Sequence, residues 1–242
     1  MTDRDRRREE LAGNLAALRV RVAGACAAAG RDPAEVTVIA VTKTFPASDI
    51  RLLAELGVTD VGENRDADAA AKHAECAELP LAWHFVGQLQ RRKCRSVARY
   101  ADVVHSVDRP ELVAALGRAA QEAGRVIAAL IQVSLDVVGL DQPAAAGRGG
   151  AAPGQVAALA EQVAAAPGLV LAGVMAVAPP GVDPEPAFER LSEVSARLRG
   201  SHPAATVVSA GMSGDLEAAV KHGATHLRVG TALLGGRSAP VG

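Results

Sequence analysis

Short runs of β-branched and other apolar residues alternate with longer segments of helical pattern along most of this chain, and this alternation limits its possible folds most strongly. Short apolar runs bounded by turn residues are typical of strands that are buried on both faces of a parallel sheet. Eight such strands are predicted, at residues 36–41, 60–63, 83–87, 103–107, 126–134, 169–177, 206–210 and 226–230.

Eight strands with helices between them favour a (β/α)8 barrel, the TIM-barrel architecture, in which helices surround a closed parallel sheet. A chain of 242 residues is long enough for one such barrel, so we expect residues 1–242 to form a single α/β domain. An open, doubly wound parallel sheet is the alternative architecture.

The chain begins with a predicted helix whose apolar residues repeat at helical spacing, and Gly30 followed by Pro33 marks its end. Few residues follow the eighth strand, so we expect this first helix to cover that side of the barrel. Asp183 and Pro184 indicate the start of another helix. The remaining helices are expected from Ser48 to Gly57, from Pro110 to about Ala123, from Pro153 to before Pro167, and from Ser213 to Gly223.

Composition argues against several classes of partner. The chain has 26 basic and 27 acidic residues and only 2% aromatic residues, so neither a nucleic acid nor an anionic membrane is an expected ligand. Its cysteines, Cys26, Cys76 and Cys94, are widely separated, which indicates neither a disulfide framework nor a metal site. The charged first ten residues lack the pattern of a secretory signal, and no uninterrupted apolar run reaches membrane-spanning length. We therefore expect a soluble, cytoplasmic protein.

Lys43 follows the first predicted strand, the apolar run from Val36 to Val41. In parallel α/β folds, ligands bind at the carboxyl ends of the strands, which is where this lysine is expected to lie. Partial burial there would lower the pKa of its amine and leave the nitrogen nucleophilic, as a Schiff base requires. A lysine that extends from a strand end into water is the alternative interpretation.

Two loops near the carboxyl terminus have the composition of a phosphate-binding site. Residues 209–215, Ser-Ala-Gly-Met-Ser-Gly-Asp, link the seventh strand to a helix, which Ser213 is expected to cap with its hydroxyl. Gly230 and Thr231 follow the eighth strand, and barrels often bind phosphate with these two loops. An ordinary capped turn is the alternative for the first loop. A lysine opposite both loops predicts pyridoxal 5′-phosphate (PLP) as the cofactor.

Three further residues are candidates for contact with this cofactor. Asn64 follows the second strand and could donate to the phenolic oxygen of PLP. His84 lies within the third strand and would point into the barrel if Trp83 points outward, although a purely structural histidine is the alternative. Arg228 is the expected cation near the phosphate or the ring nitrogen, and beside the ring nitrogen it would weaken the electron sink.

One segment, from Val137 to Ala152, interrupts the alternation of strands and helices. It is rich in Gly, Ala and Pro, contains Arg148, and follows the fifth strand at the expected ligand face. A long loop in that position is either functional or mobile.

Six segments match one known family in order and over nearly the whole chain. They are residues 40–44 (AVTKT), 62–64 (GEN), 83–90 (WHFVGQLQ), 105–108 (HSVD), 211–215 (GMSGD) and 227–231 (LRVGT). In these segments the chain resembles the YggS/PROSC family of pyridoxal 5′-phosphate homeostasis proteins. It departs from residues usual in that family at Ser134, Ala210, Arg92 and around Arg148, all at the rim or in the loop after the fifth strand.

The resemblance implies a barrel like the N-terminal domain of alanine racemase and an internal aldimine between PLP and Lys43. It also implies phosphate binding around Ser213, Gly230 and Thr231, with Arg228 close by. Met212, beside Ser213, is a further candidate for contact with the cofactor. Members of the family are thought to buffer the cofactor and deliver it to PLP-dependent apo-enzymes, without robust catalysis, and those that resemble this chain are often monomeric.

Two other functions are compatible with a lysine in such a barrel. An amino-acid racemase needs a second acid–base group on the opposite face of the cofactor ring, and the single tyrosine, Tyr100, is expected before the fourth strand, away from that place. A Schiff-base aldolase without a cofactor has no need of two phosphate-binding loops. We therefore expect a non-catalytic PLP carrier, with a PLP-dependent racemase as the alternative.

Overall fold

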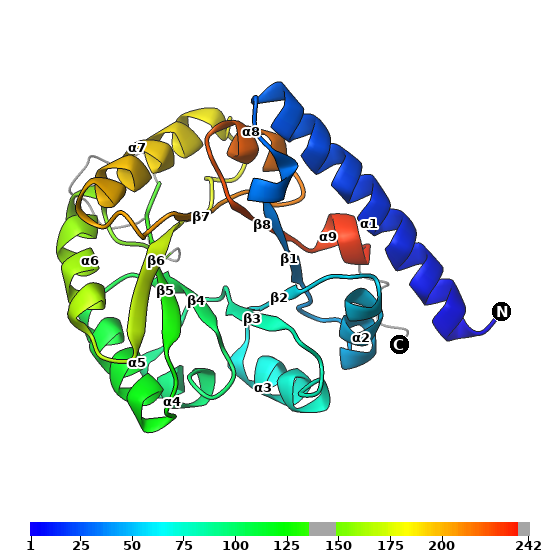
Figure 1. Ribbon diagram of the computed structural model, residues 1–242, viewed down its shortest axis with the longest axis horizontal. Helices are drawn as coiled ribbons and strands as arrows, with labels where there is room; N and C mark the ends of the chain where they lie inside the picture. Colours follow the sequence, from blue (N-terminus) through cyan, green and yellow to red (C-terminus); the bar gives the residue numbers. More distant parts are fainter. Residues whose placement is uncertain (136–148, 237–242) are drawn as a thin grey trace.

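Eight parallel strands pair in sequence order and close into a barrel, because β8 pairs with β1 (Figure 1). The computed structural model describes residues 1–135 and 149–236. The predicted (β/α)8 barrel is confirmed, and the open sheet is wrong. The strands are β1 (Thr37–Val41), β2 (Asp60–Glu63), β3 (Ala82–Phe85), β4 (Val103–Val107), β5 (Ile127–Gln132), β6 (Leu169–Met175), β7 (Val207–Ser209) and β8 (His226–Val229).

The helices form the outer layer of the barrel (Figure 1). Three of them were not expected from the sequence: α3, α4 and the last one, α9, which is a single turn after β8. The helices are α1 (Asp3–Ala28), α2 (Ala47–Glu55), α3 (Asp66–Glu75), α4 (Cys94–Val97), α5 (Pro110–Glu122), α6 (Val156–Ala165), α7 (Glu185–Ser201), α8 (Leu216–Lys221) and α9 (Thr231–Leu234).

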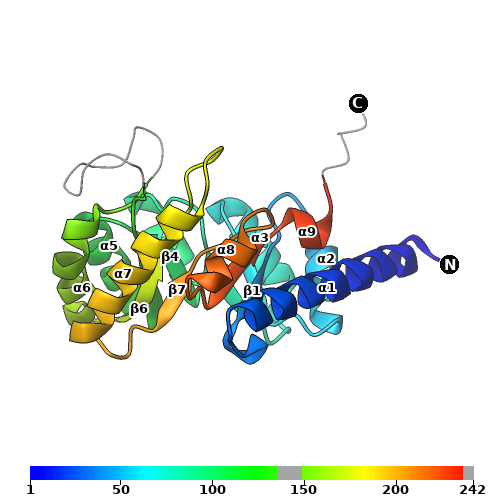
Figure 2. The ribbon, with the colours of Figure 1, turned by 90° about the horizontal axis from the view of Figure 1, so that it is seen from above.

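The first helix, α1, covers the side of the barrel where β8 and β1 meet, as expected. It lies against α8 and α9, and its amino-terminal end projects beyond the barrel (Figures 1 and 2). Thr2 and Asp5 form a capping box at its start, since each side chain accepts a hydrogen bond from the other's backbone N–H. By length and composition alone α1 could cross a membrane. Its stripe of Leu11, Leu15 and Leu18 is instead buried against the barrel, so packing within the fold accounts for its apolar residues.

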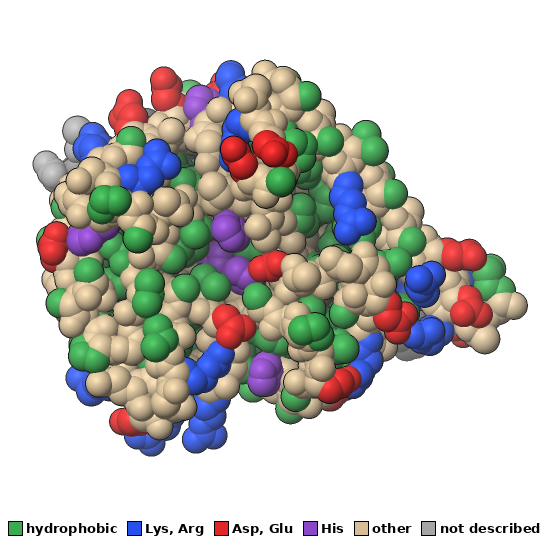
Figure 3. Space-filling model, viewed as in Figure 1, with side chains coloured by type: hydrophobic (Ala, Val, Ile, Leu, Met, Phe, Trp, Pro, Cys, Tyr) green, Lys and Arg blue, Asp and Glu red, His purple; other side chains and the backbone are tan. Residues whose placement is uncertain are grey.

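Side chains of β3 alternate between the two faces of the barrel wall. Trp83 packs edge-on against His73 of α3, with ring centroids 5.3 Å apart, whereas the next residue, His84, bonds to His105 of β4 inside the barrel. The predicted orientation of His84 is confirmed. Figure 3 shows histidine side chains close to the centre of the face seen in Figure 1. The barrel interior therefore contains buried polar side chains, among them His84, His105, Ser209 and Arg228.

Candidate functional site

A cavity of about 450 Å³ lies at the carboxyl ends of β1, β2, β3 and β8, a volume in the range of pockets that hold small ligands and cofactors. Segments far apart in the sequence form its wall, since the parallel strands bring their carboxyl ends to one edge of the barrel. Of the eight residues predicted to bind the cofactor, His84 does not line the cavity. The other seven do: Lys43, Asn64, Met212, Ser213, Arg228, Gly230 and Thr231.

Lys43 lies in the turn after β1, and its side chain is exposed. The expectation of partial burial is wrong for the protein in this form, because the lysine is already two residues past the end of the strand. The residue that follows, Thr44, has a φ of 71°, in the left-handed region that a β-branched residue rarely adopts. Strained backbone of this kind persists only where its surroundings impose it, and it occurs here beside the cavity.

Buried charges hold the other side of this turn. Lys72 of α3 donates to the Thr42 carbonyl at 2.9 Å and to Oε1 of Glu63 at 2.6 Å, and the Thr42 hydroxyl donates to the same Glu63 oxygen at 2.7 Å. All three residues are buried. The peptide preceding Lys43 is thus fixed by a hydrogen-bonded ion pair. Sequence reasoning missed Lys72, because nothing in its local pattern distinguishes it from a surface lysine of an alanine-rich helix.

The two predicted phosphate loops lie together in the wall of the cavity. The Ser213 hydroxyl accepts a hydrogen bond from the backbone N–H of Ala232 in α9 at 3.1 Å, so it joins the loop after β7 to the loop after β8. Its predicted role as a helix cap is wrong, since α8 begins at Leu216 and Asp215 is the residue at its cap. The Ser213 hydroxyl therefore bonds to a residue of the loop after β8 instead of to the start of its own helix.

Two backbone amides of the first loop, those of Ser213 and Gly214, have no hydrogen-bond acceptor among the residues that the structure describes. The neighbouring Met212 amide is used, as it donates to Asp215 Oδ1 at 2.6 Å. In the second loop, a Cβ at Gly230 would lie 3.3 Å from the Val41 carbonyl oxygen, closer than side chains normally come. The loops therefore combine free N–H groups with a close backbone approach, a combination that suits an anion.

Asn64 and Met212 line the cavity from different strands. Asn64 follows β2, and its backbone lies against Gly87, where an added Cβ would be 2.1 Å from the Asn64 carbonyl oxygen. A side chain at position 87 would therefore displace the Asn64 segment. Met212 is 38% exposed, an uncommon exposure for a large apolar side chain, and it provides apolar surface at the mouth.

Arg228 connects the cavity to the barrel interior. It is 5% exposed, and its guanidinium donates to the Ser209 hydroxyl at 2.6 Å and to the Ala176 carbonyl at 2.7 Å. Burial lowers the pKa of Arg228 to about 10, with Asp215 opposing that effect, so the group stays charged at neutral pH. Three of its five N–H groups have no acceptor among the described residues, and Arg228 supplies a fixed positive charge to the cavity.

From Ser209 a chain of hydrogen bonds crosses the barrel. Ser209 Oγ is 3.0 Å from His105 Nδ1, His105 Nε2 is 2.9 Å from His84 Nδ1, and His84 Nε2 is 3.0 Å from Asp60 Oδ1. The Asp60 carboxylate accepts, so with both histidines neutral every donor in the chain points from Arg228 toward Asp60. Burial, followed by the charges of His84 and Arg228, holds the pKa of His105 well below its ordinary value, which agrees with this arrangement. His84 thus reaches the cavity only indirectly.

Tyr100, the single tyrosine, lies away from the cavity. Its side chain is 3% exposed, and its hydroxyl has no hydrogen-bond partner among the described residues. Burial, together with the carboxylates of Asp66 and Glu63, raises the pKa of Tyr100. A phenol in this position is unsuited to move a proton at the cavity.

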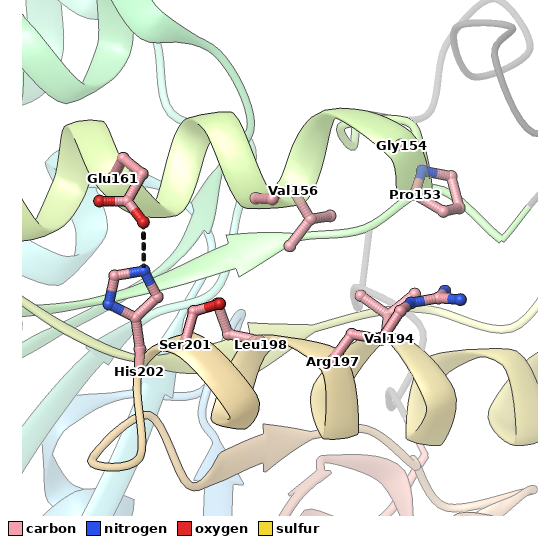
Figure 4. A pocket seen from close by; sticks show the side chains of 10 residues that line it. Pro153, Gly154, Val156, Glu161, Val194, Arg197, Leu198, Ser201 and His202 are labelled. Atoms are coloured by element: carbon pink, nitrogen blue, oxygen red, sulfur yellow. Dashed lines mark hydrogen bonds and ion pairs between the residues drawn. The ribbon is translucent and has the colours of Figure 1, made fainter.

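A second cavity, of about 430 Å³, lies between α6 and α7 and contains none of the predicted site residues (Figure 4). His202 and Glu161 bridge the two helices at one end of it, with Nε2 and Oε1 3.1 Å apart, and Arg197 lies toward the other end. The predicted loop from Val137 to Ala152 lies mostly outside the described residues. Its last part is fastened to the barrel, since Gln132 donates to the Gly149 carbonyl at 2.6 Å.

Known proteins resemble this chain in sequence and in fold. The sequence profile described as "Alanine racemase, N-terminal domain" matches residues 13–238. The pyridoxal phosphate homeostasis protein of Mycobacterium tuberculosis (strain ATCC 25618 / H37Rv) is 44% identical over 250 residues, covering 96% of this chain and 94% of that protein. The solved structure of PipY from Synechococcus elongatus PCC7942, with PLP bound, is 34% identical. It has a TM-score of 0.79 and covers 93% of this chain and 100% of that chain.

A more distant neighbour supports the fold. Alanine racemase of Clostridium difficile 630 has a TM-score of 0.72 at 12% identity, covering 96% of this chain and 58% of that chain. At such low identity the likeness concerns the barrel alone. Profile, sequence relatives and fold together assign this chain to the YggS/PROSC family of pyridoxal phosphate homeostasis proteins, which is built on the alanine racemase N-terminal domain.

Proposed function

We propose that this protein binds PLP in the cavity at the carboxyl ends of the strands, holds it covalently through Lys43, and buffers and delivers it without catalysing a reaction. The observation that carries the proposal is the presence of one reachable primary amine and two loops with phosphate-binding chemistry in a single cavity. The family to which the chain belongs, and the PLP bound in the PipY structure, support the same assignment.

The residues in the cavity fit this cofactor. When bound, PLP supplies an aldehyde that reacts with a primary amine and a phosphate that needs donors. Lys43 provides the amine. Ser213, Gly230 and Thr231 provide hydroxyl and backbone donors for the phosphate, and Arg228 adds a fixed positive charge. Asn64 and Met212 complete the wall, and His84 acts only through the hydrogen bonds that orient Arg228.

A carrier role is supported by what the cavity lacks among the described residues. A racemase needs a second acid–base group facing the ring, and Tyr100 is buried elsewhere. A charged arginine also disfavours protonation of the ring nitrogen, if it lies beside that atom, and so disfavours carbanion chemistry. We further propose that residues 1–242 act as one monomeric, cytoplasmic domain that passes PLP to apo-enzymes, with no nucleic-acid or membrane partner.

Reconstitution with PLP tests the proposal directly. The protein should become yellow, Lys43→Ala should lose the absorbance band, and Lys221→Ala, an exposed lysine on α8, should keep it. Borohydride reduction followed by peptide mass spectrometry should locate a pyridoxyl group on Lys43. A pyridoxyl group on another lysine, or on none, would refute the assignment of the site.

Two assays separate the carrier from the racemase. Transfer to a PLP-dependent apo-enzyme, measured by recovery of that enzyme's activity, should require the loaded protein. Alanine and serine racemisation should stay at the level of the Lys43→Ala variant. Racemisation well above that level would favour the enzyme instead.

A further inference from the structure

Helix α1 lies outside the barrel, yet its polar side chains reach the wall of the cofactor cavity. It runs beside α8 and α9 and also contacts α2 (Figures 1 and 2). Its buried apolar stripe packs it against the barrel. The polar contacts that α1 makes near the cavity come in addition to this apolar packing, and their position beside the cavity indicates a second role for the helix.

One of these contacts is made to the segment that carries Lys43. The guanidinium of Arg7 lies over the ring of Phe45, 5.5 Å from its centre, and Nη2 of Arg7 is 2.7 Å from Oδ2 of Asp49 in α2. Phe45 lines the cavity two residues after Lys43. Arg7 thus holds the connection between Lys43 and α2 through a cation–π contact and an ion pair.

The same guanidinium also holds the phosphate side of the cavity. Nη2 of Arg7 donates to the Leu234 carbonyl at 3.0 Å, and Asn14, further along α1, donates to the Leu233 carbonyl at 3.0 Å. Leu234 ends the single turn of α9 that begins at Thr231, and Gly235 after it lines the cavity. A single side chain of α1 therefore contacts Phe45 in one wall of the site and bonds to Leu234, the residue before Gly235, on the other side.

Other arginines of α1 make contacts of a different kind. Arg4 and Arg8 pair with Glu55 at the end of α2, and these three side chains are between 42% and 61% exposed. Arg7 is only 23% exposed and its partner Asp49 only 8%. Pairs shielded from water are screened less than exposed ones, so Arg7 makes the stronger tie. Arg4 and Arg8 are matched controls, because their recorded ion pairs join α1 to α2 but not to α9.

We propose that Arg7 is a positioning residue that couples the two ends of the cofactor site. The proposal rests on the proposed binding of PLP by this cavity. Because Arg7 contacts the segment after Lys43 and also bonds to the end of α9, ordering of the α9 segment by a bound phosphate also orders the segment that carries Lys43. By thermodynamic linkage, each half of the cofactor then raises the affinity of the site for the other half. Loss of Arg7 would weaken binding of the cofactor at both its phosphate end and its aldehyde end, and release of the cofactor would be faster.

Separate ligands for the two ends test this coupling. Pyridoxal provides the aldehyde without phosphate, and inorganic phosphate provides the other end. In the wild-type protein, inorganic phosphate should raise the affinity for pyridoxal about fivefold or more, the lower range of measured couplings. Pyridoxal occupancy would be measured by borohydride reduction and mass spectrometry of the Lys43 peptide. Arg7→Gln should abolish the effect of phosphate, whereas Arg4→Gln and Arg8→Gln should retain it.

Release of intact PLP gives a second readout. After dilution, loss of the absorbance band should be about fivefold faster in Arg7→Gln than in Arg8→Gln. Thermal unfolding of the cofactor-free variants checks the fold. If Arg7→Gln does not fold, Asp49→Asn provides the test. It removes the ion pair between Arg7 and Asp49 and keeps the bond from Arg7 to Leu234, so it should reduce the effect of phosphate on the affinity for pyridoxal.

The outcomes are distinguishable. A wild-type protein that places no pyridoxyl group on Lys43 contradicts the proposed function itself. A wild-type protein that binds PLP on Lys43 but shows no phosphate effect, or an Arg7→Gln variant that behaves as Arg8→Gln does, overturns the role of Arg7 alone.

Discussion

Two histidines of the barrel, His105 and the partly buried His226, have lowered pKa values, so we expect acid to destabilise the protein, and His226 allows the size of the effect to be worked out. His226 begins β8, its Nδ1 is 2.9 Å from the Thr225 hydroxyl, and its ring centre is 6.3 Å from that of His84. Burial, followed by the charge of His84, lowers the pKa of His226 from 6.5 to about 4. The unfolded chain therefore binds a proton more tightly than the folded protein does.

The sign of the effect follows from that difference. Between pH 6.5 and about 4 the unfolded state carries more protons, so the free energy of unfolding falls as the pH falls through this range. Above pH 6.5 the histidine is neutral in both states and its contribution is complete. The two pKa values differ by about 2.5 pH units, and each unit corresponds to about 1.4 kcal/mol, so the loss is about 3 kcal/mol. His105, whose pKa is also lowered, adds to the loss in the same direction.

Urea unfolding of the cofactor-free protein, repeated at intervals from pH 8 to pH 4, measures this effect. His226→Gln keeps a hydrogen-bonding side chain and cannot titrate in this range. The wild-type protein should lose about 3 kcal/mol relative to this variant between pH 7 and pH 4, with the change beginning near pH 6.5. Curves that stay parallel over the whole range would show that His226 is not held neutral by the fold.

Three substitutions test other parts of the site. Ser213→Ala removes a hydroxyl that we expect to contact the phosphate and that also accepts the hydrogen bond of the Ala232 amide. The affinity for PLP, measured by absorbance titration, should fall about tenfold or more. An unchanged affinity would contradict the assignment of this loop to phosphate binding. Gly87→Ala places a Cβ 2.1 Å from the Asn64 carbonyl oxygen, so the free energy of unfolding should fall by about 3 kcal/mol or more. The control is Gly214→Ala, because no atom lies within 4 Å of a Cβ at that position. His105→Phe leaves the Ser209 O–H without an acceptor and His84 Nδ1 without a donor, at a cost of about 1–3 kcal/mol each, which urea unfolding at pH 7.5 should show. A change below about 1 kcal/mol would contradict the hydrogen-bonded chain.

Much of the barrel could be predicted because its strands are buried on both faces. The predicted limits of β2 and β4 match the structure, and the other strands differ by one or two residues at their ends. Helix α3 escaped notice because alanine supplies most of its apolar face, so the pattern of large side chains that marks other helices is absent. Helix α4 is a single turn, too short to show a period.

The sequence predicted which strand ends form the candidate site, but it did not predict the contacts between the side chains there. A lysine after the first strand and glycine-rich loops after the seventh and eighth must converge once the barrel closes. The contacts depend on groups distant in the sequence. Ser213 bonds to Ala232 across the cavity wall rather than capping its own helix, and Lys72 fixes the turn before Lys43. No local pattern specifies such pairs.

The order of apolar runs, the position of Lys43 and the phosphate-binding loops are properties of the sequence itself, because each depends on neighbours along the chain. Closure of the barrel decided the rest. It aligned His84, His105, Ser209 and Arg228 from four strands into one chain of hydrogen bonds, and it brought Arg7 of the first helix against the segment after Lys43 and the end of α9. The physical reason is that hydrogen bonds act over about 3 Å, whereas these partners are separated along the chain by tens to hundreds of residues.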